Sequence, residues 1–449
     1  MSAQVMPIDR ISSVSEGKTR AVVIGASMAG LLTARVLSDF HDEVVIIEKD
    51  VVPDEPASRK GQPQTRHLHG LLARGLDVLE SLLPGLTVEL IQHGAIYDDM
   101  GSAIRWYQFG GYRRQFVSGL MGVIQSRPLL EFLVRRRVLA LPGVRLMDRC
   151  SADRLAISRG TVTGLHVLLD GRPALLSSDL VVDCAGRGSR TASWLAEAGF
   201  PSPKTSEVTV HLGYATRTYR WEEDHLTGAR LCMSLPSPPQ VRRSGFLLPI
   251  EGKRWMLTMA GWHRDYPPTD EEGFNAFARS LPLPDIYRII RSAEPLSDIL
   301  PYRFKSSRRF HYEKLSTFPD GLLVLGDAVA SFNPVYAQGM TSAAMQANAL
   351  HACLQKGLRG HALSRQYFKK VARLVDIPWQ LATGEDFRFP ETTGPKPAGT
   401  DLLNTYVTRV HKATHRDTAV YGQFLQVMNM VEPPTSLLCP RMLWRVLLR

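Results

Sequence analysis

The feature that most constrains this chain is a glycine-rich turn placed directly after a short apolar run near the N-terminus. The run Ala21–Ile24 has the composition of a buried parallel strand, and Gly25 permits the tight turn that follows it. Gly30 and Ala34 leave room for the next helix to pack closely against that strand. The N-terminus of such a helix points its free N–H groups toward a pyrophosphate. The segment therefore predicts a βαβ unit that binds a dinucleotide.

A second apolar strand follows at the spacing that such a unit needs. Val44–Ile47 ends in Glu48, and an acidic residue about 20 positions after the glycines holds a ribose hydroxyl in these units. Ser27 stands where the middle glycine of the fingerprint is usual; it is small, and its hydroxyl can donate to phosphate. The alternative is a unit of this kind without a ligand, but the strand, the helix and Glu48 together favour a ligand. The predicted contact residues are Gly25, Ser27, Met28, Ala29, Gly30, Glu48 and Lys49.

The size and composition of the chain limit its class. Its 449 residues exceed what one compact core holds, so two or three lobes are expected. No apolar stretch approaches the roughly 20 residues that span a bilayer. Met1–Arg20 is polar and has no apolar signal segment, which predicts a cytoplasmic protein. The five cysteines have neither metal-ligand nor redox spacing, so we expect reduced thiols and no metal site.

The charge of the chain is strongly basic. A net charge of +11 favours anionic partners in general. The run Arg135–Arg137 follows leucines at helical spacing and predicts a solvated helix face, because no nucleic-acid motif accompanies it. We therefore expect no nucleic-acid partner. The last apolar stretch, Met442–Leu448, carries arginines and is expected to pack on the body of the protein in preference to a membrane surface.

Two kinds of strand pattern follow the first unit. Short apolar runs between glycine turns predict a small β-meander inside the first domain, over 144–147, 155–157 and 165–169. Alternating residues over 208–218 and two strands about the turn at 251–252 predict an antiparallel sheet in a second domain. A buried strand at 322–325 then returns to the first domain, and a helix over 339–355 follows it.

Two later glycine-containing segments extend the pattern. Within Asp179–Arg190, an apolar strand ends in an aspartate and continues Cys-Ala-Gly before a helix. The segment Gly326–Met340 begins Gly-Asp and continues through a proline to a glycine that opens a helix. Together with the N-terminal fingerprint, these segments resemble the three signatures of the FAD-dependent aromatic-hydroxylase-type (group A) flavoprotein monooxygenases. The signatures come in the family's order and extend over residues 20–357.

The resemblance implies an α/β fold. A Rossmann-like FAD-binding domain, with a parallel sheet and the β-meander, would be interrupted by an antiparallel-sheet substrate domain and followed by a mostly helical C-terminal segment. The implied boundaries are 18–90, 120–200 and 305–360 for the FAD-binding domain, 91–119 and 201–304 for the substrate domain, and 361–449 for the C-terminal segment. The resemblance also implies FAD as cofactor and NADH or NADPH as electron donor, acting directly or through a separate flavin reductase.

Roles for single residues also come from the resemblance. Asp327 matches the aspartate that bonds the flavin ribityl chain, and Arg127 matches a basic residue on a helix beside the flavin. Gly339 and Met340 open a helix whose positive end would stabilise the anion formed when the flavin is reduced. The family pattern is broken at Ala337, where glycine is common, and at Asp-Cys-Ala-Gly in place of Asp-Gly. The implied cofactor-binding residues beyond the N-terminal unit are Arg66, Arg127, Asp183, Ala185, Gly186, Gly326, Asp327, Pro334, Gly339 and Met340.

The segment Arg59–Gly70 resembles a natural-product subgroup that includes polyene epoxidases and hydroxylases. Its two histidines, His67 and His69, either bond the flavin or substrate or satisfy the loop backbone, and both interpretations stay open. Because a bound flavin carries the chemistry, no acid or base side chain is obligatory. The catalytic residues are therefore unknown, with His67, His69 and Tyr336 as candidates.

The implied function is insertion of one oxygen from O₂ into a small-molecule or peptide-borne aromatic ring or alkene. Hydroxylation or epoxidation would proceed through a flavin C4a-hydroperoxide. The substrate pocket is expected between the flavin and strands near Leu212, Tyr214 and Leu247. Three alternatives share the fold: a flavin-dependent halogenase, an isoprenoid-type reductase and a non-catalytic prenyl-binding chaperone. A halogenase is expected to carry a Trp-x-Trp motif, which none of the seven tryptophans forms.

Overall fold

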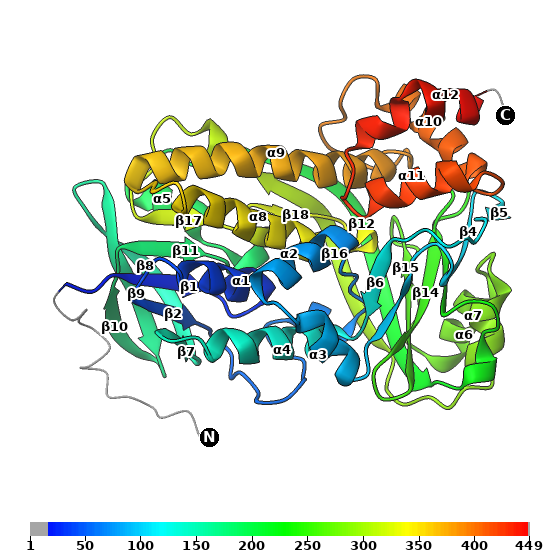
Figure 1. Cartoon of the computed structure of the whole chain (residues 1–449), viewed down its shortest axis with the longest axis horizontal. Helices are drawn as coiled ribbons and strands as arrows, with labels where there is room; N and C mark the ends of the chain where they lie inside the picture. Colours follow the sequence, from blue (N-terminus) through cyan, green and yellow to red (C-terminus); the bar gives the residue numbers. More distant parts are fainter. Residues whose placement is uncertain (1–16, 448–449) are drawn as a thin grey trace.

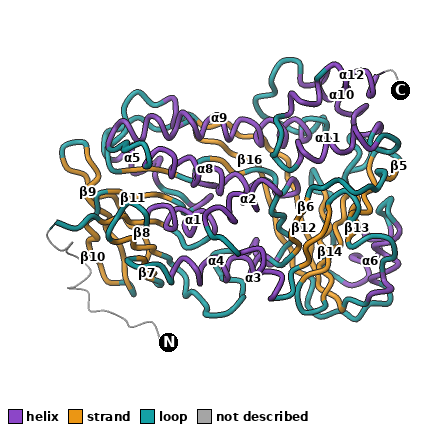
Figure 2. The backbone as a smooth tube through the Cα atoms, in the orientation of Figure 1, coloured by secondary structure: helices purple, strands orange, loops and turns teal. Residues whose placement is uncertain are grey.

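The structure, a computed structural model, describes residues 17–447, so the signal-segment prediction for Met1–Arg20 lies almost entirely outside the described residues. Two sheet-centred bodies lie side by side, and a group of C-terminal helices lies against the second of them (Figure 1). Figure 2 shows the strands gathered in these two bodies with helices around them. No helix among the described residues is long and apolar enough to cross a membrane.

The first body is built on a five-stranded parallel sheet with the order β17-β11-β1-β2-β7. Its strands are β1 (Arg20–Ile24), β2 (Glu43–Ile47), β7 (Val144–Met147), β11 (Leu180–Asp183) and β17 (Leu322–Val324). Strands β1, β11 and β17 are buried along their whole length, as is usual for a parallel sheet covered on both faces. These three strands are neighbours, so the glycine turns that follow them leave from the same edge of the sheet.

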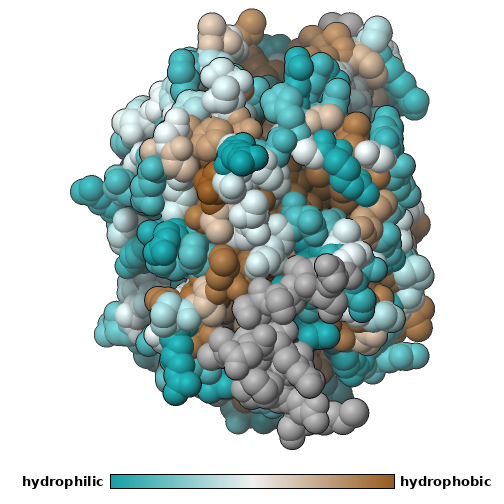
Figure 3. All heavy atoms as spheres, turned by 90° about the vertical axis from the view of Figure 1, so that its left-hand side faces the viewer, coloured by the Kyte–Doolittle hydropathy of each residue, from teal (hydrophilic) through white to brown (hydrophobic). Residues whose placement is uncertain are grey.

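A three-stranded antiparallel meander with the order β10-β9-β8 packs beside this sheet. Its strands are β8 (Cys150–Ser158), β9 (Thr161–Leu169) and β10 (Arg172–Ser177). The prediction that 144–147 belongs to the meander is wrong, because this run pairs in parallel with β2 and forms the edge of the larger sheet. The side of the molecule that carries the meander shows polar and apolar areas interspersed (Figure 3).

Seven helices of the described chain pack around the first body. They are α1 (Met28–Leu37), α2 (Ala73–Leu82), α3 (Leu86–Gln92), α4 (Arg127–Leu139), α5 (Thr191–Glu197), α8 (Gly339–Leu354) and α9 (Gly360–Asp386). Helix α1 contacts both α4 and α8, and most of its residues are buried. The solvated face predicted at Arg135–Arg137 is wrong at Arg135, whose buried guanidinium donates to the carbonyl of Pro53. Arg136 and Arg137 pair instead with Glu89 of α3.

The second body is an eight-stranded sheet with the order β18-β16-β12-β15-β14-β13-β4-β5. Its strands are β4 (Ile104–Gln108), β5 (Gly111–Tyr112), β12 (Thr205–Arg220), β13 (Leu231–Ser234), β14 (Arg243–Ile250), β15 (Arg254–Gly261), β16 (Leu300–Phe310) and β18 (Ala330–Ser331). All neighbours pair antiparallel except β13 and β4, which are parallel. A separate hairpin-like pair joins β3 (Ile96–Asp99) to β6 (Met121–Ile124).

The two faces of the large sheet have different partners. Leu247 and Leu257 pack with α6 (Glu271–Arg279) and α7 (Pro284–Ile290) on the face away from the first body. Leu247 itself therefore points away from the first body, although strands near it were expected to line the substrate pocket. Successive residues of a strand point to opposite sides, so other residues of β14 face the first body. Thr216 lies on the inner face, where it bonds a histidine of the first body.

The C-terminal helices are α10 (Thr400–Ala413), α11 (Thr418–Met428) and α12 (Pro440–Leu447). Arg113, whose side chain is buried, contacts these helices from the edge of the sheet. Its guanidinium carbon lies 3.9 Å from the ring centre of Trp106 and 4.3 Å from that of Phe424, and Nη1 donates to Thr414 at 2.7 Å. A buried arginine between aromatic rings contributes through both charge and packing. Met442 and Val446 of α12 are buried in the same apolar cluster.

Candidate functional site

The glycine turn after β1 brings backbone atoms unusually close together. Gly25 has a φ of +100°, and its N–H donates to the carbonyl of Ile47 at 2.8 Å. A β-carbon built on Gly30 would lie 1.8 Å from the carbonyl oxygen of Gly25, so only glycine fits there. Ser27 is the N-cap of α1, and its side chain does not cap the helix. The first-turn N–H groups of Met28, Ala29 and Gly30 therefore remain for an external acceptor.

The second motif meets the first through the end of β11. A β-carbon on Gly25 would lie 2.9 Å from the carbonyl oxygen of Cys184. Asp183, fully buried, accepts from Ala185 N at 2.8 Å and from Thr191 Oγ1 at 2.5 Å. Both of its carboxylate oxygens are thus occupied by its own turn. Its side chain holds the shape of the turn that presents Gly186.

The third motif, Gly326–Met340, lies against both of the other two. A β-carbon on Gly326 would lie 2.8 Å from the β-carbon of Ala29 in the first motif. A β-carbon on Gly186 in the second motif would lie 3.8 Å from that of Asp327. Three stretches far apart in sequence therefore share one small region at the edge of the parallel sheet.

Asp327 stands at the centre of this region with an exposed side chain. A β-carbon on Gly339, the first residue of α8, would lie 3.7 Å from its Oδ1. Helix α8 has no side-chain cap at its N-terminus, so first-turn N–H groups there are also left without an intrahelical acceptor. Met340 is buried, and Pro334 begins the 3₁₀ turn that precedes the helix.

Ala337 adopts a strained conformation in this turn. Its φ of 56° and ψ of 22° place a non-glycine residue in the left-handed region, where the family pattern has glycine. We expect Ala337→Gly to raise the free energy of unfolding by about 0.5–1 kcal/mol, because glycine adopts this conformation without a steric penalty. Urea unfolding followed by circular dichroism measures the change. A destabilised variant would contradict the strain that we assign to Ala337.

Glu48 lies at the end of β2, where a ribose-binding acid is predicted. Its carboxylate accepts from Ala26 N at 3.0 Å and from Asp50 N at 3.2 Å. It also pairs with Arg59 at 2.9 Å, and both side chains are buried. The next residue, Lys49, is exposed. Glu48 is thus fixed directly beside the glycine turn.

A buried cluster of charged side chains lies beneath the start of α1, formed by Glu48, Arg59, Arg127 and Glu131. Glu48 and Arg127 were predicted from the sequence as cofactor-binding residues, whereas Arg59 and Glu131 were not. Arg59 pairs with Glu131 at 2.8 Å, and Arg127 pairs with the same carboxylate at 3.0 Å. Arg127 also donates to the hydroxyl of Ser27 at 2.9 Å, which links the cluster to the helix cap. Burial raises the pKa of Glu131, but Arg127 and Arg59 outweigh it and leave that pKa lowered. The signal that could have revealed Glu131 is its position four residues after Arg127 among buried leucines.

The histidine segment joins the two bodies. Nδ1 of His67 lies 2.8 Å from Thr216 Oγ1 on β12, and its ring centre lies 5.4 Å from that of Tyr302. Nδ1 of His69 lies 2.9 Å from the carbonyl of His67. Burial, with Arg66, lowers the pKa of His67 to about 4. His69 thus contacts the backbone of its own loop, whereas His67 joins the loop to β12.

A depressed histidine pKa makes stability depend on pH. Burial, with Arg127, also lowers the pKa of His69 to about 4 from an ordinary value of 6.5. The histidines of the unfolded chain take up protons below pH 6.5, whereas these folded histidines stay neutral until about pH 4. The free energy of unfolding therefore decreases as the pH is lowered from 6.5 to about 4. We expect His67→Asn to show a shallower fall than the wild type in urea unfolding over this range. Identical slopes would contradict the assignment.

A cavity of about 350 Å³ lies between the bodies beside this segment. Its charged residues include Arg66 and Arg254, and Arg254 donates to Glu251 at 3.2 Å. Ser126, the N-cap of α4, donates its backbone N–H to Glu251 at 2.9 Å. Thr216, the partner of His67, also lines the cavity. The lining thus carries a net positive charge and also includes apolar side chains such as Met256 and Leu300.

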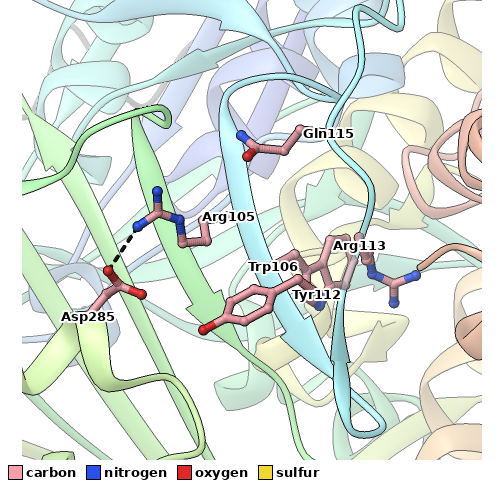
Figure 4. A pocket seen from close by; sticks show the side chains of 6 residues that line it. All are labelled: Arg105, Trp106, Tyr112, Arg113, Gln115 and Asp285. Atoms are coloured by element: carbon pink, nitrogen blue, oxygen red, sulfur yellow. Dashed lines mark hydrogen bonds and ion pairs between the residues drawn. The ribbon is translucent and has the colours of Figure 1, made fainter. Parts of the chain in front are cut away.

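A smaller pocket, about 250 Å³, lies at the far edge of the large sheet (Figure 4). Arg105 forms an ion pair with Asp285 at 2.8 Å on one side of it. The guanidinium of Arg113 points away from that pair toward the C-terminal helices. The charged groups do not converge, and the pocket is remote from the glycine motifs. Among the described residues, no group of three or more His, Cys, Asp or Glu side chains could hold a metal ion.

The region where the motifs meet fits a dinucleotide. Two helix N-termini without side-chain caps, α1 and α8, offer amides for anionic or carbonyl groups. Glycines 186 and 339 leave the space beside the exposed carboxylate of Asp327 free of side chains. Glu48 is fixed at the strand end where a ribose hydroxyl is expected. One FAD molecule would satisfy all of these groups together.

Comparisons with known sequences agree with this geometry. A family model described as an FAD binding domain matches residues 18–380. Protein Rv3254 of Mycobacterium tuberculosis (strain ATCC 25618 / H37Rv) is 34% identical over 441 residues, with 93% of this chain and 91% of that protein covered. Kynurenine 3-monooxygenase of Salinispora tropica is 25% identical, with coverages of 75% and 73%.

Solved structures share the fold. The flavin-dependent brominase Bmp2 has a TM-score of 0.66 at 14% identity, with 92% of this chain and 94% of that chain covered. PqsL, a probable FAD-dependent monooxygenase from Pseudomonas aeruginosa, has a TM-score of 0.60 at 17% identity, with coverages of 83% and 98%. PqsL has also been solved in complex with 2-aminobenzoylacetate. At these identities the likeness concerns the fold alone.

Proposed function

The chain belongs to the FAD-binding-domain family of aromatic-hydroxylase-type flavoprotein monooxygenases, and we propose that it inserts one oxygen atom from O₂ into an electron-rich aromatic ring. The observation that carries this proposal is the meeting of three glycine motifs around Asp327. Such a meeting point is needed to hold one long cofactor by its pyrophosphate, its ribityl chain and its ring at once.

The residues that would hold FAD follow from the site. The amides of Ser27 to Gly30 would bind the pyrophosphate, and Glu48 would bind the adenosine ribose. Asp327 would bond the ribityl chain, and the N-terminus of α8 at Gly339 would face the ring. Bound FAD supplies the redox chemistry that activates O₂. The positive end of α8 stabilises negative charge that develops beside it, and the packed bodies on either side exclude water.

The substrate class is supported by the relatives. Two kynurenine 3-monooxygenases match the chain, and PqsL binds 2-aminobenzoylacetate, whose name contains an amino-substituted benzene ring. We therefore favour an amino- or hydroxy-substituted aromatic small molecule over an alkene or a peptide-borne ring. The cavity beside Thr216 is of suitable size, and Arg66 at its rim has the charge to attract an acidic substrate. We propose NADH or NADPH as the electron source, directly or through a flavin reductase.

The test is isotope incorporation with the purified FAD-loaded protein. The wild type is incubated with ¹⁸O₂, NADH or NADPH with and without a flavin reductase, and a panel of aminoaryl ketones, phenols and alkenes. We expect one heavy oxygen in the product of at least one ring substrate, and none from an H₂¹⁸O control in unlabelled O₂. Loss of NAD(P)H with only H₂O₂ formed, for every panel member and either donor, would contradict the proposal.

Halogenation is the second candidate function, because the brominase Bmp2 shares the fold. The sequence lacks the Trp-x-Trp motif expected of that class, which favours oxygenation. The same incubation with added bromide distinguishes the two, since a halogenase gives a brominated product without labelled oxygen. A reductase would give a saturated product. A prenyl-binding chaperone would give no product from any panel member.

A further inference from the structure

The C-terminal helices leave large apolar side chains uncovered. Six of the fifteen such side chains that are exposed in the described chain come from residues 402–447. Leu402 of α10 is 78% exposed, and Trp444 of α12 is 48% exposed. Exposed apolar side chains that gather on one surface usually mark an interaction site. The six residues are Leu402, Leu403, Val431, Leu438, Trp444 and Leu447.

Helix α12 is apolar on two sides, and one of them packs on the protein. Met442 and Val446, four residues apart, are buried in the apolar cluster beneath the C-terminal helices. This is the packing on the body that the sequence predicts for the last apolar stretch. Arg441, Trp444 and Leu447 follow one another at intervals of three residues and are exposed. The outer side of α12 is therefore an apolar stripe that begins with a basic residue.

Helix α10 places its exposed apolar residues next to this stripe. It contacts α12, and the two helices lie at the same outer edge of the molecule (Figure 1). The hydroxyl of Tyr406 on α10 donates to the carbonyl of Leu437 at 2.6 Å, directly before Leu438. Leu402 and Leu403 are one helical turn before Tyr406 and extend the same surface. We call this surface the C-terminal patch, formed by Leu402, Leu403, Leu438, Trp444 and Leu447.

Basic side chains accompany the C-terminal patch. Arg409 and Lys412 follow Leu402 by seven and ten residues, so they lie on its side of α10, and both are exposed. Arg441 is exposed on α12. Within the described part of the chain, none of these three basic side chains forms an ion pair. Their positive charges are therefore available to an anionic partner.

The acidic side chains of the same helices are mostly neutralised. Asp401 lies 2.5 Å from Lys396, and Asp417 lies 2.6 Å from Arg445. Glu432 is exposed and forms no ion pair with any described residue. One unpaired acid thus stands against several unpaired basic groups. The C-terminal patch is therefore an apolar surface in a positively charged surround.

We propose that the C-terminal patch docks this protein on the surface of an anionic phospholipid membrane. Its leucines and tryptophan would enter the boundary between head groups and acyl chains, while the arginines and the lysine would remain among the lipid phosphates. Tryptophan and basic residues are typical of protein segments at this boundary. A second copy of the chain fits less well, because a two-fold interface would bring the same basic residues together. This inference is independent of the monooxygenase function proposed above.

The first test is sedimentation of the full FAD-loaded chain with lipid vesicles. One set of vesicles contains phosphatidylcholine alone, and the other contains equal parts of phosphatidylcholine and phosphatidylglycerol. We expect the protein to sediment with the anionic vesicles, and we expect less of it to do so at high salt, which screens the charges. Absence of binding to the anionic vesicles, or equal binding to both sets, would overturn the proposal.

The second test assigns the binding to the C-terminal patch. The double variant Leu402→Ser, Trp444→Ser and the single variant Arg441→Glu should each bind the anionic vesicles at least about tenfold more weakly than the wild type. Leu175→Ser and Arg172→Glu are matched controls on β10, where both side chains are exposed at the opposite end of the molecule (Figure 1). The controls should keep wild-type binding. Unchanged binding in both patch variants, or an equal loss in the controls, would contradict the assignment.

A second copy of the chain is the alternative occupant, and light scattering tests it. We expect the wild type and the double variant to have the same mass in solution, because the C-terminal patch meets lipid and not another chain. A wild-type dimer that the double variant dissociates would overturn the proposal in favour of a contact between copies. Flavin content equal to the wild type confirms that each variant is folded.

Discussion

Replacing Gly30 by valine is expected to leave the protein without FAD after purification. The β-carbon would lie 1.8 Å from the carbonyl oxygen of Gly25, so either the turn after β1 or the start of α1 must move. That movement displaces the amides proposed to bind the pyrophosphate. We expect FAD affinity to fall at least a hundredfold, which is about 3 kcal/mol. Titration of the apoprotein with FAD, followed by quenching of flavin fluorescence, measures the loss.

A second glycine provides the control. Gly384, inside α9, has nothing closer than 4.0 Å to a built β-carbon, and its backbone has a helical conformation. Gly384→Ala should therefore keep wild-type FAD affinity and add about 0.5–1 kcal/mol of stability. Flavin content equal to the wild type in Gly30→Val, with the control also normal, would contradict the location of the pyrophosphate site.

Replacing Glu131 by glutamine is expected to lower the free energy of unfolding by about 3–5 kcal/mol at neutral pH. The substitution keeps the shape of the side chain but leaves the buried guanidinium groups of Arg59 and Arg127 without their shared carboxylate. Because the folded pKa of Glu131 is lowered, its contribution is present above about pH 4.5 and is lost as the pH falls below that value. Urea unfolding of the apoprotein at neutral and acidic pH measures both effects.

The matched control lies on α3, which packs against α4. Glu89 pairs with Arg136 and Arg137 of α4, and the side chain of Arg136 is 50% exposed. Glu89→Gln should therefore cost less than Glu131→Gln, because Arg136 and Arg137 are more exposed to solvent than Arg59 and Arg127. Equal losses of unfolding free energy in the two variants would contradict the view that burial determines how much the Glu131 cluster contributes to stability.

The sequence was sufficient for the features that depend on local spacing. Gly25 and Gly30 predict the turn after β1, and the structure confirms both the strand before it and the helix after it. The parallel sheet, the meander and the second sheet were expected from apolar runs and alternation. The family pattern led to Asp327 and Gly339, and their closeness in the structure follows from adjacent strands ending at one sheet edge.

Features that depend on tertiary pairing were missed or misplaced. A four-residue apolar run such as 144–147 fits a meander and a sheet edge equally well, and only its pairing with β2 decides. Alternation in the strand of Leu247 gives two faces without saying which one meets the first body, and Leu247 itself packs on the face toward α6 and α7. The ion pair of Arg59 with Glu131 carries no local signal, since the two residues are distant in sequence.

The central claim is that three separate motifs hold a single FAD, and the flavin content of the intact wild-type chain tests it most directly. The protein is purified, incubated with excess FAD, desalted and denatured, and the released flavin is counted against protein. The account predicts a yellow protein with close to one FAD per chain. A colourless protein after this treatment would contradict it.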